Sequence, residues 1–332
     1  MFTELKKLVM PIGVSGDEEN ISSVIAAEIA PYVDKVYNDA LGNLIAFKKG
    51  KGKKPKKLMF AAHMDEIGFM VSYIDEDGFI RVSRIGGINY QAASFTEVIF
   101  KNGTKGVLVP EARITGREYR PENYYVDIGA KSRKDAMRRV KIGDTCRVAP
   151  NLFKLAGSRV AGRPIDDRIG CTMLIEAAKS AKEFENDTYF VFTVQEEVGV
   201  RGAKTSAFSV TPDYAVVVDI GGAGDMPSCA PLAVNLGDGI AIKIKDAMVI
   251  CNPVMVALMK ETAKNLNVPC QLEILEGGGT DTCAIQQAAG GCIAGALSVP
   301  TRYGHSAVEV IDMNDVAGGI KILAGICETK LS

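Results

Sequence analysis

Two adjacent glutamates follow an apolar run and precede a glycine-containing turn. Residues 189–194 predict a buried strand, and Glu196 and Glu197 come just before Gly199. Neighbouring residues on a regular strand point to opposite faces of the sheet, so both carboxylates can serve one site only where the strand ends. The pair is then either a solvated surface charge pair, the commonest situation for glutamate, or a metal-ligand carboxylate beside a general base.

The chain has only two histidines, His63 and His305, and each lies just beyond a predicted strand. Asp219 follows a third predicted strand, residues 214–218. In open α/β sheets, sites form outside the carboxyl ends of the strands, so these side chains can converge on the glutamate pair. Each histidine taken alone is equally compatible with a hydrogen-bonded structural role.

Asp166 and Asp167 precede a helix predicted over about residues 169–184. One carboxylate at this place can cap the helix by accepting a backbone N–H, and this is a natural role for Asp167. Only one cap is needed. Asp166 therefore remains free to point into the cleft.

Two histidines and three carboxylates form a ligand set that suits two divalent ions, provided that one carboxylate bridges them. We expect zinc, with cobalt or manganese as alternatives. Asp65, two residues after His63, is placed to accept the other imidazole N–H and so to fix the tautomer. Paired ions of this kind lower the pKa of a bound water and polarise a scissile carbonyl, so no serine or cysteine nucleophile is needed.

The elements that would position these residues belong to a large α/β unit with a β-rich insert. Continuous apolar runs such as residues 58–62 predict strands buried on both faces. Between about residues 68 and 158, short strands are separated by Asp-Gly and Asn-Gly turns. We predict an α/β fold with a mixed central sheet flanked by helices (residues 1–67 and 159–332) and an inserted small β-barrel-like domain (residues 68–158).

The composition argues against nucleic acid and membranes as partners. The chain has 39 Lys and Arg against 40 Asp and Glu, so it has no overall charge bias. The basic run 48–57 contains glycine and proline and predicts a solvated hairpin loop. The eight cysteines include no C-x-x-C pair, a pattern typical of reduced thiols. We expect a cytoplasmic enzyme without a secretion signal or a membrane span.

Five motifs occur in order along the chain. They are His63-x-Asp65-Glu66-Ile67-Gly68, Gly162-Arg163-x-x-Asp166-x-Arg168-x-Gly170, Gln195-Glu196-Glu197-x-Gly199-x-Arg201-Gly202-Ala203, Gly278-Gly279-Thr280-Asp281 and Arg302-Tyr303-x-His305-Ser306. Together they resemble the tetrahedral dinuclear-metal aminopeptidases, the group that includes glutamyl and deblocking aminopeptidases. The match covers nearly the whole chain, and it implies a zinc-exopeptidase-like fold.

The resemblance also implies a role for each residue. Asp166 would bridge two metal ions, His63 and Asp219 would complete one metal site, and Glu197 and His305 would complete the other. Glu196 would be the general base, with Asp65 as the second residue of the catalytic pair. The protein would then be a metal-dependent hydrolase that removes N-terminal residues from short peptides with a free N-terminus. Its insert would build the contacts of dimers that assemble into a dodecamer.

Two other functions use the same residues. A glycoside hydrolase also needs paired carboxylates, about 5–9.5 Å apart, but sugar platforms usually need exposed aromatic side chains. The chain has no tryptophan and an aromatic content of 7%, which disfavours that interpretation. A metal-stabilised scaffold without turnover is the third alternative, and the intact Glu196 argues against it.

Overall fold

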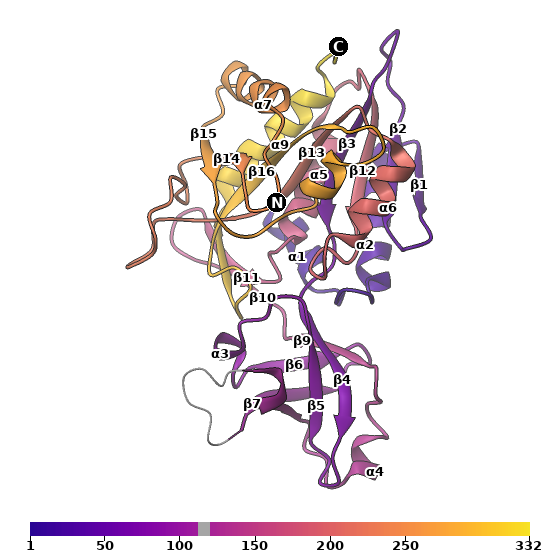
Figure 1. The fold of residues 1–332 in the computed structure, drawn as a ribbon, viewed down its shortest axis with the longest axis vertical. Coiled ribbons are helices and arrows are strands. Elements are labelled where there is room, and N and C mark those ends of the chain that lie inside the picture. Colours follow the sequence, from indigo (N-terminus) through magenta and orange to yellow (C-terminus); the bar gives the residue numbers. More distant parts are fainter. Residues whose placement is uncertain (112–119) are drawn as a thin grey trace.

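The computed structural model describes residues 1–111 and 120–332. In this part of the chain an α/β unit carries a small β-barrel at one end (Figure 1). The α/β unit and the barrel are the mixed sheet with flanking helices and the inserted barrel that the sequence predicts. No helix in the described ranges is long and apolar enough to cross a membrane.

The α/β unit is built on one large mixed sheet. Its strands are β1 (Lys35–Asn38), β2 (Leu44–Lys48), β3 (Lys57–His63), β10 (Asn151–Lys154), β11 (Arg159–Arg163), β12 (Asp187–Thr193), β13 (Tyr214–Gly222), β14 (Ile240–Lys245), β15 (Cys270–Ile274), β16 (Ile293–Arg302) and β17 (Glu309–Asp312). They follow the order β1-β2-β12-β3-β13-β16-β17-β11-β10, and β14 joins β15 to β16. Strands β12, β3, β13 and β16 are parallel, so their carboxyl ends share one edge.

The central strands are apolar on both faces because helices cover both faces. In β3, Leu58, Phe60 and Ala62 pack into one hydrophobic core, whereas Met59 and Ala61 pack into a second. This alternation follows from the period of two residues along a strand. A continuous apolar run therefore predicts a doubly covered strand, as found here.

Helices of unequal number cover the two faces of the sheet. The larger core lies under α1 (Phe2–Val9), α2 (Glu19–Ile29), α5 (Arg168–Ser180), α7 (Pro253–Asn265) and α9 (Met313–Cys327). The smaller core lies under α6 (Arg201–Val210) and α8 (Thr282–Gln286). Helix α7 begins as its sequence predicts, because Asn252 caps it through the Val254 N–H and Pro253 occupies the first turn.

The barrel closes six antiparallel strands in the order β4-β5-β8-β7-β6-β9. These are β4 (Gly68–Ile74), β5 (Ile80–Ile85), β6 (Glu97–Phe100), β7 (Lys105–Pro110), β8 (Tyr124–Asp127) and β9 (Thr145–Val148), with the short helices α3 (Tyr90–Ala93) and α4 (Arg133–Ala136) beside them. The barrel has its own core, which includes Phe69, Phe100 and Tyr124. Its strands end at Val148, and β10, which we placed in the insert, pairs with β11 of the large sheet.

The predicted hairpin around the basic run 48–57 is wrong. Its flanking strands, β2 and β3, are not neighbours, because β12 inserts between them and pairs with both. The basic run is instead a loop that connects two strands across an intervening one. Local sequence marked the loop correctly but carried no information about a strand that comes some 130 residues later.

A buried charge cluster joins the barrel to the α/β unit. The Glu66 Oε1 atom accepts from Arg147 Nη1 of β9 at 2.8 Å and from Arg168 Nη2 of α5 at 3.2 Å. All three side chains are at most 3% exposed. The two guanidinium groups also donate to the carbonyls of Val9, the last residue of α1, and of Pro11, just beyond it. The barrel is therefore fixed to the residues that lead directly into the candidate site.

Candidate active site

The candidate site lies at the carboxyl edge of the parallel strands. His63 ends β3 and is level with Thr193 at the end of β12. In the neighbouring pair, Val217 of β13 is level with Ala61 of β3, so two residues further along Asp219 is level with His63. Strand β13 continues to Gly222 instead of ending at Asp219 as expected. Parallel register alone thus brings one histidine, one aspartate and the glutamate turn together.

Asp166 lies between the two imidazoles. Its Oδ1 is 3.0 Å from His63 Nε2, and its Oδ2 is 3.1 Å from His305 Nε2. The same Nε2 atom of His305 is 3.5 Å from Glu197 Oε2. Asp166 comes from the loop between β11 and α5, and His305 from the loop after β16. One carboxylate therefore faces two ligand-type nitrogen atoms, as a bridging group must.

Asp167 caps a helix and also lies in the candidate site. It caps α5 as expected, because its Oδ1 accepts the Gly170 N–H at 3.0 Å. Its other oxygen, Oδ2, is buried without a hydrogen-bond partner. Asp167 also lies with His63 and Asp219 in a group whose ligand atoms are within 4.8 Å of one another, while His63, Asp166 and Glu197 form a second such group.

Both histidines present the Nε2 atom to the site because a backbone carbonyl faces Nδ1. His63 Nδ1 lies 3.1 Å from the Asp65 carbonyl oxygen, and His305 Nδ1 lies 2.9 Å from the Gly87 carbonyl oxygen. A carbonyl can only accept, so each Nδ1 carries the proton. Each Nε2 lone pair is then available to a metal ion, which is the arrangement of histidine ligands generally.

The Asp65 carboxylate faces the glutamate turn as well as His63, as whose partner it was expected. Its Oδ1 is 3.5 Å from His63 Nδ1, whereas it is 3.0 Å from the Glu196 N–H nitrogen. Its Oδ2 accepts the Glu197 N–H at 3.2 Å and the Ser15 hydroxyl at 2.6 Å. Asp65 therefore orients the glutamate turn through its carboxylate, and it faces His63 Nδ1 with both its backbone carbonyl and its carboxylate.

Glu309 is a residue of the site that the sequence did not reveal. It is 1% exposed, and its Oε2 accepts the backbone N–H groups of Ile165 and Asp166 at 2.7 and 3.1 Å. Its Oε1 accepts the His305 N–H at 3.1 Å. One buried carboxylate thus holds the backbone of two predicted ligands. The only sequence signal was an acidic residue inside the apolar segment that forms β17.

Burial and mutual repulsion raise the pKa of several carboxyl groups. Burial, with the nearby Asp166 charge, raises the pKa of Glu197 to about 8. Burial raises the pKa of Asp219 to about 7, with Asp166 adding to the rise and His63 opposing it. Burial likewise raises the pKa of Glu196 well above its usual value. A carboxyl group resists ionisation where negative charge is concentrated away from water.

The histidines and Asp166 shift in the complementary direction. Burial lowers the pKa of His63, but hydrogen bonds to Asp166 and Asp65 outweigh it and leave that pKa well above its usual value. The hydrogen bond to Asp166 raises the pKa of His305 to about 10. Burial raises the pKa of Asp166, but its two histidine partners lower it further than burial raises it. The donor set, with its unpartnered buried oxygen on Asp167, fits divalent cations because its carboxylates outnumber its two imidazoles.

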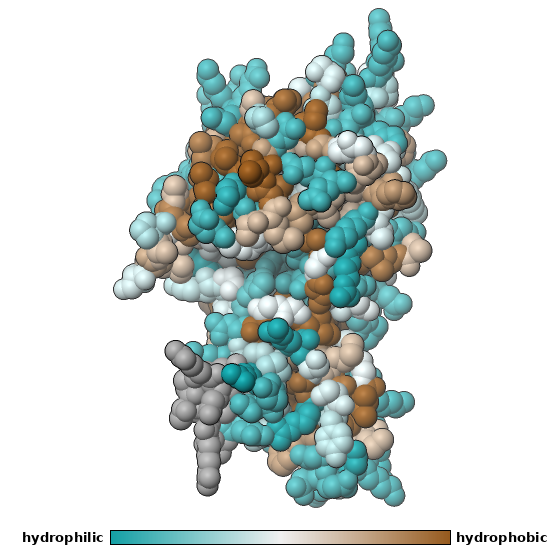
Figure 2. All heavy atoms as spheres, in the orientation of Figure 1, coloured by the Kyte–Doolittle hydropathy of each residue, from teal (hydrophilic) through white to brown (hydrophobic). Residues whose placement is uncertain are grey.

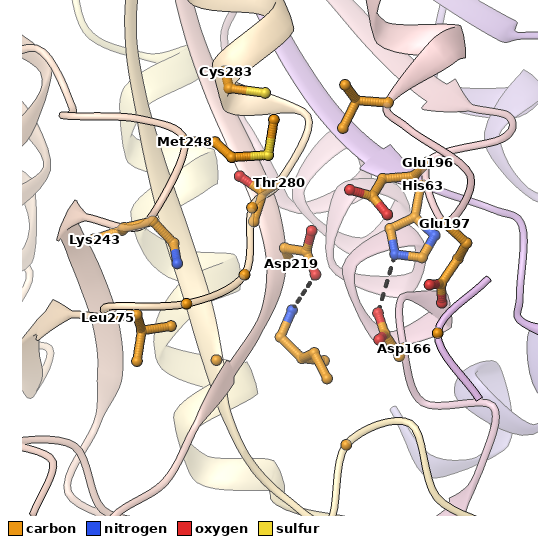
Figure 3. Close-up of a pocket in the computed structure, with 18 of the residues that line it drawn as sticks. His63, Asp166, Glu196, Glu197, Asp219, Lys243, Met248, Leu275, Thr280 and Cys283 are labelled. Carbon is orange, nitrogen blue, oxygen red and sulfur yellow. Dashed lines mark hydrogen bonds and ion pairs between the residues drawn. The ribbon is translucent and has the colours of Figure 1, made fainter. Parts of the chain in front are cut away.

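The residues face a cavity of about 990 Å³. Figure 3 shows His63, Asp166, Glu196 and Glu197 on one side of it, with Lys243 and Leu275 across from them. The loop Gly277–Gly279 lines the far wall. The structure thus brings the five predicted ligands and Glu196 to one cavity.

The metal-free protein should lose stability as the pH rises from about 5 to about 8. Asp219 and Glu197 have folded-state pKa values of about 7 and 8, against reference values of 3.8 and 4.5. The folded chain binds these protons more tightly than the unfolded chain, so this stabilisation is full below the reference values and disappears as the pH passes 7 and 8. The raised pKa values of both histidines act in the same direction.

Thermal unfolding in the presence of a chelator, at pH 5, 6.5 and 8, measures this loss. Zn²⁺ added at pH 8 should raise the Tm again, because it supplies the missing positive charge. The double variant D219N/E197Q should show a flatter dependence on pH. A Tm that is constant or rises between pH 5 and 8 in the chelated wild type would contradict the expectation.

The chain is similar to known aminopeptidases over nearly its full length. A candidate aminopeptidase of Acetivibrio thermocellus is 48% identical over 330 residues, which is 98% of each chain. The lysyl aminopeptidase of Pyrococcus furiosus is 36% identical and covers 98% of this chain and 96% of its own. The TET1 peptidase of Pyrococcus horikoshii, described as assembling into a tetrahedron or a large octahedral shell, has a TM-score of 0.87 at 33% identity, with 98% of each chain covered.

A family model spans the same region and includes every predicted site residue. It is that of the M42 glutamyl aminopeptidases, and it matches residues 42–322. The matched segment contains the parallel strands, including His63 at the end of β3, the barrel and the loop that carries His305. The chain belongs to the M42 family of glutamyl aminopeptidases.

Proposed function

We propose that the protein is an aminopeptidase that works with two divalent ions and uses Glu196 as its general base. Family membership supports peptide hydrolysis. The position of the Asp166 carboxylate, 3.0 and 3.1 Å from two imidazole nitrogen atoms, is the single observation that carries the two-ion centre. A carboxylate shared in this way would hold both ions if cations took the place of the protons between it and the imidazoles.

The residues divide into two ligand sets around Asp166. His63 and Asp219 would complete one set, and Glu197 and His305 the other. Asp167 has one oxygen committed to the cap of α5, and its second oxygen, close to His63 and Asp219, is placed to support the first set. When bound, the ions supply a water of lowered pKa and polarise the carbonyl of the substrate.

Glu196 is the residue that would move the proton. It lines the cavity, and no hydrogen bond or ion pair of its carboxylate is seen within the described chain (Figure 3). Its raised pKa suits a base that takes a proton from water and then delivers it to the leaving amine. The surrounding carboxylates would hold the positively charged α-amino group of the peptide, which makes the enzyme an exopeptidase.

Hydrolysis should require both a free N-terminus and a divalent metal. A panel of aminoacyl and N-acetylated aminoacyl substrates, with acidic, basic and apolar first residues, tests the first requirement and also gives the side-chain preference. Chelation should abolish release of the first residue, and zinc, cobalt or manganese should restore it. Equal cleavage of a peptide and its acetylated form would refute the aminopeptidase proposal, and metal-independent release of reducing sugar would favour the glycoside hydrolase.

Substitution of the two adjacent glutamates should separate their roles. Glu196→Gln removes a base but keeps its shape, so the protein should retain two ions per chain while kcat falls about 10²–10⁴-fold. Glu197→Gln weakens a ligand and should cost one ion. Asp166→Ala should weaken both sites together, because less charge separates the two cations. Metal analysis and kcat of the purified variants distinguish these roles, and Glu183→Gln, at an exposed position, is the control. Loss of metal in Glu196→Gln with two ions kept in Glu197→Gln would reverse the assignment.

We also propose that the chain assembles into a dodecamer through its barrel. The relative from Pyrococcus horikoshii supports assembly, and the barrel exposes Phe95 and Ile142, which are 71% and 64% exposed. A competing surface lies over α7 and β15, where apolar side chains gather on the face shown in Figure 2 and Ile274 is 56% exposed. Large apolar side chains at such exposure mark contact surfaces when they cluster.

Light scattering on two charge variants distinguishes these surfaces. Ile142→Glu in the barrel should reduce the assembly to a smaller species, because a buried unpaired carboxylate is costly at an interface. Ile274→Glu should leave the mass unchanged. The opposite result would move the contact to the face of α7 and β15. Point variants are preferable to excision of the barrel, since the barrel segment supplies the Gly87 carbonyl that faces His305.

A further inference from the structure

The turn that carries Glu196 has a backbone that must be held from outside. Gln195 and Val200, which bracket the two glutamates, have φ values of +55° and +50°. Side chains other than glycine rarely adopt this left-handed region, least of all a β-branched one such as valine. Such conformations persist where surrounding contacts determine them, so the contacts of this turn are informative.

Four consecutive backbone N–H groups of the turn donate to side chains from other parts of the chain. The Val194 N–H donates to Asn43 Oδ1 at 3.0 Å. The Glu196 and Glu197 N–H groups donate to the two oxygens of Asp65. The fourth, the Gln195 N–H, donates to Glu18 Oε1 at 3.2 Å across 177 positions of sequence.

Glu18 is built for this contact. Glu18 is only 7% exposed, and its Oε1 also accepts the Gly16 N–H at 2.7 Å. Burial and the Asp65 charge raise the pKa of Glu18 to about 7, so its placement opposes its own ionisation. Surface glutamates at helix starts do not need burial, and Glu19, the next residue, has a side chain that is 88% exposed. Glu18 does not line the cavity, so any effect on chemistry passes through the turn.

The segment that bears Glu18 is itself fixed at both sides. The Ser15 hydroxyl donates to Asp65, and the Ser15 N–H donates to the Glu66 carbonyl at 3.2 Å. On the other side, Asp17 accepts from the Thr145 hydroxyl of the barrel at 2.6 Å and from the Lys101 ammonium. Residues 15–18 therefore form a strap between the barrel and the turn.

We propose that Glu18 is a positioning residue for Glu196: by accepting the Gln195 N–H it fixes the direction in which the glutamate turn leaves β12. This inference rests on the proposed role of Glu196 as the base. A base that is displaced by about 1 Å can lose about 10²-fold in rate, because proton transfer needs hydrogen-bond geometry. The acceptor atom, not the negative charge, is what the contact requires.

Three variants separate this role from a general loss of folding. Glu18→Ala removes the acceptor and should lower kcat about 10–10²-fold while KM stays within about twofold. Glu18→Gln keeps an Oε1 acceptor and should restore kcat to within about threefold of the wild type. Glu19→Ala, at the neighbouring exposed position, should match the wild type. Metal content should be unchanged in all three, unlike Glu197→Gln.

Hydrogen exchange of residues 194–202 gives a readout that does not depend on activity. Amides of this segment should exchange at least about tenfold faster in Glu18→Ala than in the wild type, and at wild-type rates in Glu18→Gln and Glu19→Ala. Should Glu18→Ala lose cooperative unfolding, Glu18→Met keeps the length of the side chain without the acceptor and takes its place.

The outcomes are distinct. If the wild type hydrolyses no peptide, the proposed function fails, and the exchange comparison still decides whether Glu18 holds the turn. Wild-type exchange and kcat in Glu18→Ala would overturn the inference while leaving the aminopeptidase intact. Equal damage in Glu18→Gln and Glu18→Ala would also overturn it, because the charge and not the acceptor would then matter. A rise in KM at constant kcat would assign Glu18 to substrate binding instead.

Discussion

Burial of negative charge at the carboxyl edge of the parallel sheet is the constraint on which the rest of the structure depends. Asp166, Asp167 and Asp219 are each at most 6% exposed, and the two imidazoles lie 3.0 and 3.1 Å from the Asp166 oxygens. Water cannot solvate these carboxylates, so protons or cations must neutralise them. The raised pKa values in the site and its fit to divalent ions have the same cause, which is too little positive charge around the buried carboxylates.

A second layer of acids holds this centre by its backbone. Glu309 accepts the N–H groups of Asp166 and His305, Asp65 accepts those of both glutamates of the turn, and Glu18 accepts the one before them. Each outer carboxylate directs its oxygens at amides, whose partial positive charge compensates it locally. Among the inner carboxylates, Asp166 directs both oxygens at the imidazoles, and Asp167 keeps one oxygen without a hydrogen-bond partner. The site is thus rigid although it is built largely from loops.

The sequence predicted what depends on neighbouring residues and missed what depends on distant ones. The strand that ends at His63, the strand end just before the glutamate pair, the cap at Asp167 and the mixed sheet with its barrel follow from local periodicity and turn residues. The insertion of β12 between β2 and β3 could not be predicted, because strand order is set by packing across the whole chain. The roles of Glu309 and Glu18 were not predicted for the same reason. Each accepts an N–H group that lies more than 140 residues away in the sequence. The assignment of metal ligands came from the family resemblance and stays a prediction.

The Gly87 carbonyl that faces His305 limits how the two parts of the chain can diversify. A barrel without contacts to the candidate site could be exchanged between relatives as a module. Here its root supplies an acceptor for one imidazole, a guanidinium for Glu66 and a hydroxyl for Asp17. The hairpin tip between β4 and β5, residues 75–79, lies at the far end of the barrel (Figure 1). Chimeras and inserted sequences should therefore succeed at that tip and fail at the root, where a graft would also change contacts of the candidate site.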